Sequence, residues 1–294
     1  NTILLDEILN QQKISEPASQ NIDNSKIISK YFNYTIELLD LILDPMAIAG
    51  QEALGSMGDD TPLSVLTDNY RGLHTFFKQN FAQVTNPPID SLREQIVMSL
   101  KTRLGNLGNI ADSDEDQLNL VLLESPILLD HELYALKSHL EKNTTEIDCT
   151  FEKEKETNFL QEIQRIYLEA ERAVRSGSQH IILSDKKIDE SKISLPMILV
   201  TSAVHNYLIK NKLRTFTSLN VSSKECLDVH YFAVLIGVGA TTVNASLIES
   251  LIFERLNKGI YGKAEFNSLI LNYKQSIEKG LRKIISKMGI SIIS

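Results

Sequence analysis

The segment His180-Ile181-Ile182-Leu183-Ser184 decides the fold class that this sequence favours. It is an apolar run too short for a helix, and it lies between two segments with helical spacing, residues 159–174 and 196–209. In the first, apolar side chains recur every three or four positions, and the second has Pro196 in its first turn. A buried strand between two helices is typical of a parallel α/β sheet.

The same alternation continues on both sides of this strand. Further strands are expected at residues 147–151, 215–221 and 241–244, and further helices at residues 225–236 and 247–256. Short connections favour parallel pairing, in a sheet that either stays open or curves into a partial, barrel-like half circle. We therefore expect a βα-repeat part at residues 144–256. A helical or irregular part, residues 1–143, should precede it, and a helical connection, residues 257–294, should follow.

In the N-terminal part, a short helix is expected within residues 1–30, and further helices are expected at residues 35–43 and 91–104. The last of these expectations rests on Ser91 and Glu94, which have the spacing of a capping box. Apolar residues then recur at helical spacing as far as Leu104, and Gly105 would end the helix.

Composition excludes several classes of protein. The 294 residues are 43% hydrophobic and carry a net charge of -8, which argues against nucleic acid as a partner. No apolar run approaches the ~18–20 residues that cross a bilayer, so no membrane association is expected. Cys149 and Cys226 are far apart in sequence, which suits a reducing, cytoplasmic setting. The chain begins with Asn1, so we expect an excised fragment or a processed product.

Several stretches of the sequence are distinctive, and those at residues 45–62 and 81–90 are not periodic patterns that an amphipathic helix would produce. They are PMA at residues 45–47, GQEALGSMGDDTP at 50–62, FAQVTNPPID at 81–90, ILSD at 182–185, SAVH at 202–205, LIGVGA at 235–240 and KMGIS at 287–291. In content and order they resemble the central domain of the glutamate synthase large subunit. The resemblance spans nearly the whole chain, which is thus identified as a member of that family.

The resemblance implies a non-catalytic domain that connects a glutaminase domain to an FMN-binding synthase domain of the same polypeptide. The whole enzyme, an oxidoreductase, forms glutamate from glutamine and 2-oxoglutarate with FMN and a 3Fe-4S cluster. A small NADPH-oxidising subunit or ferredoxin is a possible further partner, and the electron donor stays open. The family's central domain is an α/β domain similar to a reduced flavin barrel, and KMGIS marks where the flavin domain begins.

Thr85 and Asn86 are the candidate site residues, because the resemblance implies that they line the entrance of an ammonia tunnel. They offer short polar groups beside Pro87 and Pro88, which stiffen the backbone. A channel for neutral ammonia needs hydrogen-bonding walls without a strong acid that would trap ammonium. A second interpretation, compatible with the first, makes Asn86 a turn residue before proline.

No catalytic, cofactor-binding or metal-binding residue is expected in this chain. Cys149 and Cys226 are interpreted as buried small hydrophobic residues. The resemblance implies a glutaminase that uses an N-terminal cysteine, and position 1 of this sequence is Asn. No cysteines have the clustered spacing of an iron–sulfur site. His205 and His230 come from successive helices and could be neighbours. Polar packing is favoured over a metal role for them.

A different class of function stays open beside the first. The chain could be a free-standing α/β enzyme that binds a small phosphorylated or sugar ligand at the carboxyl ends of its strands. Asp185 and Asn244, each near such an end, would then be the binding residues.

Overall fold

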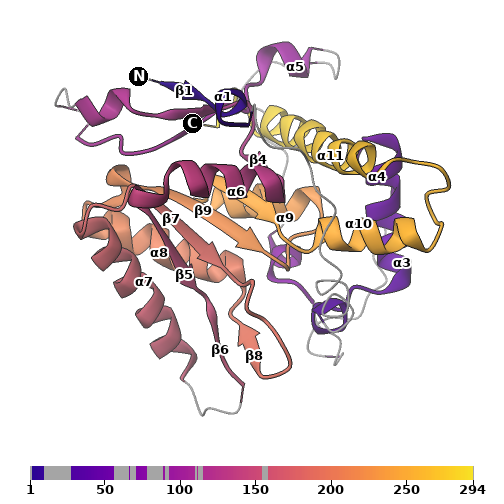
Figure 1. The fold of residues 1–294 in the computed structure, drawn as a ribbon, viewed down its shortest axis with the longest axis horizontal. Helices are drawn as coiled ribbons and strands as arrows, with labels where there is room; N and C mark the ends of the chain where they lie inside the picture. Colours follow the sequence, from indigo (N-terminus) through magenta and orange to yellow (C-terminus); the bar gives the residue numbers. More distant parts are fainter. Residues whose placement is uncertain are drawn as a thin grey trace.

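A five-stranded parallel sheet forms the centre of the molecule (Figure 1). The computed structural model describes residues 2–9, 28–55, 66, 71–77, 89, 93–109, 111, 115–153 and 158–293. In the described residues, every strand pair of this sheet is parallel, in the order β4-β10-β9-β7-β5. The strands are β4 (Ile127–Leu128), β5 (Thr144–Asp148), β7 (His180–Ser184), β9 (Ser218–Ser223) and β10 (Thr242–Ala245). The expected parallel α/β fold is confirmed.

Four of these strands are each followed by a helix, as the sequence predicts. The helices are α7 (Phe159–Arg175), α8 (Met197–Lys210), α9 (Val229–Gly237) and α10 (Ile248–Asn257). A fifth unit was not expected: β4 leads into α6 (Asp130–His139), which leads to β5. Because β4 and β5 are opposite edges of the sheet, α6 runs over its face.

The two faces of the sheet differ in chemistry. Consecutive strand residues point to opposite sides, and in β7, β9 and β10 the apolar residues occupy alternate positions. Ile181, Leu183, Leu219, Val221 and Val243 belong to the main core, which also contains residues of α7, α8, α9, α10 and α11. The intervening positions of the same strands carry mostly polar side chains that are also buried: His180, Ser184, Ser218, Asn220, Ser222, Thr242 and Asn244.

A second, three-stranded sheet packs against α6. It contains β1 (Ile3–Leu4), β3 (Val121–Leu123) and β2 (Thr102–Leu104), in the order β1-β3-β2. Strand β1 is parallel to β3, and β2 is antiparallel to it. A smaller core joins this sheet to α1 (Leu5–Leu9), to leucines of α6 and to Ile182 of the main sheet. Helix α6 is thus held between two sheets.

The prediction of a helix at residues 91–104 was wrong in its extent. Only α5 (Glu94–Val97) is helical, and Met98 after it is extended. The apolar residues that suggested one helical face separate into two environments: Ile96 is exposed, whereas Leu104 is buried in β2. Pairing with β3 therefore overrides the local helical period. Ser91 lies outside the described residues.

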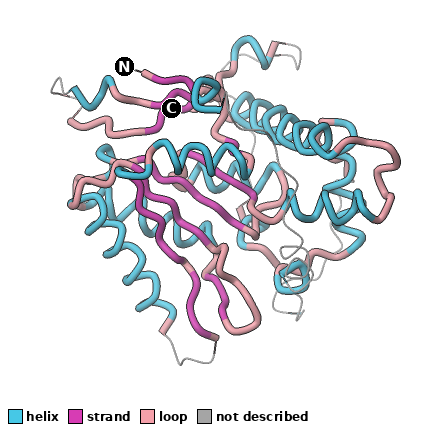
Figure 2. The backbone as a smooth tube through the Cα atoms, viewed as in Figure 1, coloured by secondary structure: helices cyan, strands magenta, loops and turns pink. Residues whose placement is uncertain are grey.

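The remaining elements complete the helical layer on the apolar side of the sheet (Figure 2). The helix expected at residues 35–43 continues to residue 49 as α3 (Ile36–Leu38), the π-helical turn Leu39–Leu43 and α4 (Asp44–Ala49). Helix α11 (Phe266–Lys287) packs against α4 and α9.

A short antiparallel ribbon, β6 (Thr150–Glu152) with β8 (Lys192–Ser194), extends one edge of the main sheet. Short 3-10 turns occur at Leu73–Phe76, Glu115–Leu118, Glu141–Asn143 and Arg214–Phe216. No helix of the described residues is long and apolar enough to cross a membrane.

Candidate functional site at the carboxyl edge of the sheet

Asp185 directly follows β7 and is fully buried. Its carboxylate accepts hydrogen bonds from Ser223 Oγ at 3.1 Å and from the backbone amide of Lys224 at 2.9 Å. Burial raises the pKa of Asp185 to about 7, although these hydrogen bonds and the positive charge of Lys224 act in the opposite direction. The group therefore ties the end of β7 to the loop after β9.

Asn244, near the end of β10, joins three strands. Its Oδ1 accepts a hydrogen bond from Ser222 Oγ at 2.8 Å, and its Nδ2 donates to the carbonyl of Leu128 and to Asp130 Oδ1. Ser222 binds Asn244, whereas the next residue of β9, Ser223, binds Asp185. Consecutive strand residues point to opposite faces, so Asp185 and Asn244 are not parts of one site.

Two carboxyl groups lie beside Asn244, that of Glu249, which is buried, and that of Asp130, which is partly buried. The backbone amide of Asp130 donates to Glu249 Oε1 at 2.7 Å. Burial, and then the negative charge of Asp130, raises the pKa of Glu249 to about 8, and burial also raises the pKa of Asp130. Sequence analysis missed Asp130 because the strand before it has only two residues. Within the described part of the chain, no three His, Cys, Asp or Glu side chains are placed to hold a metal ion.

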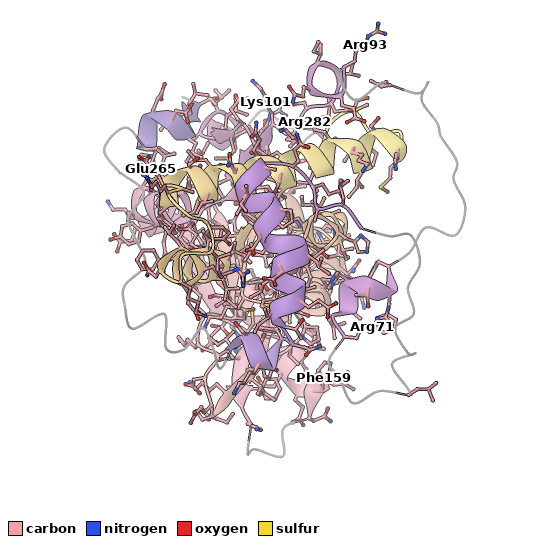
Figure 3. The ribbon with its side chains drawn as sticks, turned by 90° about the vertical axis from the view of Figure 1, so that its right-hand side faces the viewer. Arg71, Arg93, Lys101, Phe159, Glu265 and Arg282 are labelled. Carbon is pink, nitrogen blue, oxygen red and sulfur yellow. The ribbon has the colours of Figure 1, made fainter. Side chains whose placement is uncertain are left out.

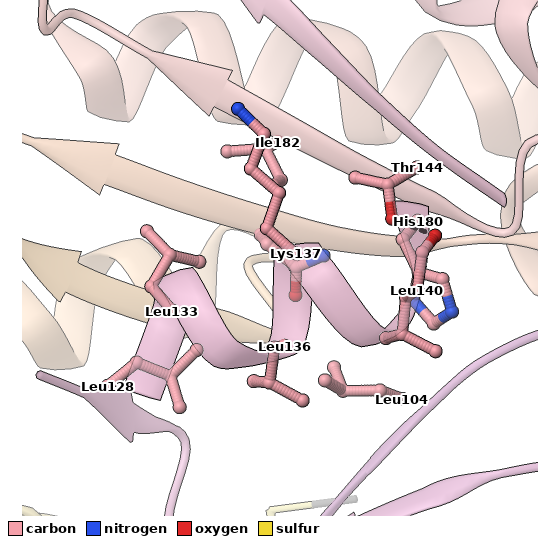
Figure 4. Close-up of a pocket in the computed structure, with 10 residues that line it drawn as sticks. Leu104, Leu128, Leu133, Leu136, Lys137, Leu140, Thr144, His180 and Ile182 are labelled. Atoms are coloured by element: carbon pink, nitrogen blue, oxygen red, sulfur yellow. Dashed lines mark hydrogen bonds between the residues drawn. The ribbon is translucent and has the colours of Figure 1, made fainter. Parts of the chain in front are cut away.

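The polar face of the sheet is closed by α6 (Figure 4). The pocket between them has a volume of about 10 Å³, and leucines of α6 line it together with His180, Ile182 and Asn220. That is room for roughly one water molecule. His180 Nδ1 lies 2.7 Å from Ser218 Oγ, and burial lowers the pKa of this histidine to about 4. No substrate fits in this pocket.

A larger cavity, of about 240 Å³, lies at the carboxyl end of β9. Two N-terminal segments, residues 32–35 and 71–75, form it with the loop after β9. Tyr34 OH donates to the carbonyl of Glu225 at 2.6 Å. His74 Nε2 is 3.7 Å from Asp228 Oδ2, and His230 Nε2 is 2.9 Å from the carbonyl oxygen of His74. These contacts fix both segments to the carboxyl edge of the sheet.

Thr85 and Asn86 lie outside the described residues. The described positions nearest to them in sequence are Phe77 and Ile89. Ile89 is partly buried and packs against the main core. The segment that contains Phe77 is held at the carboxyl edge through His74.

The two histidines that sequence analysis paired have different partners. His205 Nδ1 accepts a hydrogen bond from Arg214 Nε at 3.0 Å, and burial, with the charge of Arg214, lowers the pKa of this histidine. His230 instead contacts His74. Polar packing accounts for both. His74, which sequence analysis did not single out, contacts both Asp228 and His230 and so attaches its segment to the carboxyl edge of the sheet.

Both cysteines are fully buried. Burial raises the thiol pKa of Cys149 and of Cys226. A thiol needs a stabilised thiolate and access to act as a nucleophile, and neither residue has them. The expectation that they behave as small hydrophobic residues fits this geometry.

The fold is thus a parallel α/β domain whose strand-end polar groups bind one another. The family model described as the glutamate synthase central domain matches residues 28–294. The chain belongs to this family. It is 52% identical to the glutamate synthase [NADPH] large chain of Azospirillum brasilense, over 100% of this chain and 20% of that protein.

Two less similar relatives are also matched over most of this chain and over less than a fifth of their own length. The chain is 39% identical to the glutamate synthase [NADPH] large chain of Bacillus subtilis, over 90% of this chain and 17% of that protein. It is 37% identical to the ferredoxin-dependent glutamate synthase of Pyropia yezoensis, over 94% of this chain and 19% of that protein. The chain therefore spans about a fifth of the length of these relatives.

Among solved structures, a flavocytochrome b2 mutant with pyruvate bound is similar at a TM-score of 0.38. The sequence identity is 12%, and the match covers 57% of this chain and 50% of that chain.

Proposed function

We propose that this chain is the non-catalytic central domain of a glutamate synthase, which connects a glutaminase domain with an FMN-binding synthase domain. The whole enzyme would form glutamate from glutamine and 2-oxoglutarate in the cytoplasm, with FMN and a 3Fe-4S cluster bound outside this chain. Its electrons would come from a small NADPH-oxidising subunit or from ferredoxin. The observation that carries the proposal is the match over the full chain to relatives about five times as long.

The geometry of the carboxyl edge supports a connecting role rather than a catalytic one. Asp185 and Asn244 would be the binding residues of a free-standing enzyme, yet both are buried and bound to neighbouring protein groups. The pockets that adjoin Asn244 and the polar face of the sheet have volumes of about 10 Å³ each. A sugar or phosphorylated ligand needs a cavity of roughly 300 Å³ or more.

Thr85 and Asn86 are proposed to contribute to the passage through which ammonia leaves the glutaminase site. The described residues on either side of this segment are attached to the rest of the domain. Residues 71–77, upstream, are bound to the carboxyl edge through His74, and Ile89, downstream, packs on the core. Pro87 and Pro88 restrict the backbone between them.

The test replaces Asn86 in the full-length enzyme. Asn86→Leu replaces the hydrogen-bonding carboxamide by a bulkier apolar group of the same branching, so it should uncouple glutamine hydrolysis from glutamate formation or prevent activation of the glutaminase. The measurement is the ratio of glutamine consumed to 2-oxoglutarate consumed, together with turnover. We expect the ratio to rise or turnover to fall.

Asn206→Leu is the matched control, because Asn206 is exposed on α8 and its Nδ2 donates, within the described part of the chain, to Ser202 alone, one turn earlier. It should change neither quantity. If the Asn86 variant behaves like this control, the two residues have no part in ammonia transfer.

A further inference from the structure

The outer face of the three-stranded sheet has an unusual composition for a free surface. Its inner residues, Val121, Leu123 and Leu104 among them, pack against α6. On the outer face, Leu4, Leu122 and Arg103 are in register across β1, β3 and β2. Leu4 is 43% exposed and Arg103 is also exposed. One face of this small sheet is therefore packed, and the other presents a row of leucines beside a guanidinium group.

A groove of about 300 Å³ runs along this outer face. Leu120, Leu122 and Ile292 provide its apolar part, and Lys101 and Arg103 provide its charged part. Ile292 is 60% exposed. Exposed apolar surface of this kind, next to polar groups, is typical of an interface.

The C-terminal residues of the described chain form one wall of the groove. The amide of Ser99 donates to the carbonyl of Ser291 at 2.9 Å, and Ser99 and Ile292 form a parallel β-bridge. The direction of residues 291–293 is thereby fixed alongside the segment that leads into β2. Any polypeptide attached after residue 294 starts at this groove.

The charge of the surroundings restricts what can cover the groove. Figure 3 places Lys101, Arg93 and Arg282 at the same end of the molecule. Lys101 Nζ lies 3.1 Å from Glu124 Oε1. No carboxylate of the described residues pairs with Arg103. An apolar surface with acidic residues at its margin would complement this groove.

We propose that this outer face, defined by Leu4, Leu122, Arg103, Lys101 and Ile292, is the docking surface for the domain that follows residue 294 in the same polypeptide. The inference rests on the proposed function, under which that domain is the FMN-binding one. The covering surface is apolar with Asp or Glu at the positions that meet Lys101 and Arg103. A long flexible linker is not needed, because the chain leaves from within the interface.

The test places a photo-crosslinker at the centre of the leucine row in the full-length enzyme. Leu122→p-benzoyl-L-phenylalanine is irradiated, and the cross-linked peptides are identified by mass spectrometry. We expect cross-links to peptides that follow residue 294. Cross-links to the glutaminase domain or to a second copy of the enzyme, or no protein cross-link at all, would overturn the proposal.

A matched probe and two charge variants separate docking from folding. Leu160→p-benzoyl-L-phenylalanine, at an exposed position on α7, should give no cross-link to the following domain. Leu4→Asp and Arg103→Glu should each speed proteolytic cleavage just after residue 294 by about tenfold or more, because each weakens docking. Leu160→Asp should leave the cleavage rate unchanged. Equal rates in all three variants would contradict the proposal.

The result is independent of the test of the proposed function. If the full-length protein does not consume 2-oxoglutarate with glutamine, the proposed function fails whatever the cross-links show. If that activity is present and the cross-links lie elsewhere, only the docking surface is wrong.

Discussion

At the scale of single residues, the strand-end positions show how a polar side chain can serve structure instead of binding. Asp185 and Asn244 have the residue types and positions of a ligand site in an α/β protein. Each is instead bound to a serine of β9, and both are buried. Sequence could identify these positions as strand ends. It could not show that their hydrogen-bonding capacity is used inside the protein, because their partners are 22 and 38 residues away.

The buried carboxyl of Asp185 should make stability depend on pH. Its pKa is raised to about 7 in the folded state and is ordinary in the unfolded state, so the folded state binds the proton more tightly. Its contribution is therefore complete below about pH 4 and is lost as pH rises towards 7. Asp185→Asn should remove this loss, which is on the order of a few kcal/mol. Urea unfolding of the wild type and of Asp185→Asn, each at pH 5 and pH 8, measures how much the free energy of unfolding changes with pH in the two proteins.

Asp148→Asn provides the control for this prediction. The pKa of Asp148 is lowered because hydrogen bonds from Thr150 and the charge of Lys187 outweigh its burial. Its contribution changes only as pH falls below about 4, so the variant should leave the difference between pH 5 and pH 8 as it is in the wild type. If both Asn variants alter that difference equally, the assignment to Asp185 is wrong.

At the scale of elements, the helices and strands that could be predicted from the sequence are the longer ones, in which buried residues recur with a regular period. Helix α7 and strand β7 were found within a residue of their observed ends. Strands β1 and β4 have two residues each, and β2 has three, which is too short for a period to be recognised. These strands exist because neighbouring strands supply their hydrogen bonds, and that information is not local.

Gly280 should be required for the packing of α11 on α9. A Cβ atom built on Gly280 would lie 2.5 Å from Cγ1 of Val229, too close for contact without a shift. Overpacking of this kind costs about 1–3 kcal/mol, whereas alanine gains at most about 1 kcal/mol in helix propensity. Gly280→Ala should therefore lower the free energy of unfolding, as measured with urea.

Two further variants check the physical reason. A Cβ atom built on Gly237, at the end of α9, meets no atom of the described residues within 4 Å outside its own helix backbone and chain neighbours, so Gly237→Ala should be neutral or slightly stabilising. Val229→Ala combined with Gly280→Ala should cost less than the sum of the two single changes, because the smaller side chain makes room. Strict additivity in this cycle would show that the two residues do not clash.

Arg255 should link α10 to the N-terminal helices. Its guanidinium donates to Asp44 and Asp40, and Tyr261 OH donates to Asp44 at 2.7 Å. Arg255→Met would leave the carboxylate of Asp44 buried without its cation, which typically costs about 3–5 kcal/mol. Thermal unfolding should show a clear decrease in Tm. Lys258→Met, which removes an exposed ion pair with Glu254, should produce little change.

At the scale of the whole molecule, the family could be identified from sequence, but the internal arrangement could not. Unusual stretches such as GQEALGSMGDDTP and FAQVTNPPID carried the resemblance, and the comparisons confirmed the family. Helix α6 between two sheets was not predicted, because it depends on β4 joining the sheet at the edge opposite β5. This arrangement closes the polar face of the sheet.

The isolated chain should therefore have neither glutaminase nor glutamate-forming activity, and it should bind no flavin. Both cysteines are buried, and burial raises their thiol pKa values, so neither can supply a nucleophilic thiolate near neutral pH. A thiol reagent such as 5,5′-dithiobis(2-nitrobenzoic acid) should react with neither cysteine in the folded chain and with both in urea. Glutamine hydrolysis and flavin titration are measured on the same preparation. A rapidly reacting thiol together with ammonia release, or stoichiometric binding of FMN, would show that this domain performs chemistry of its own.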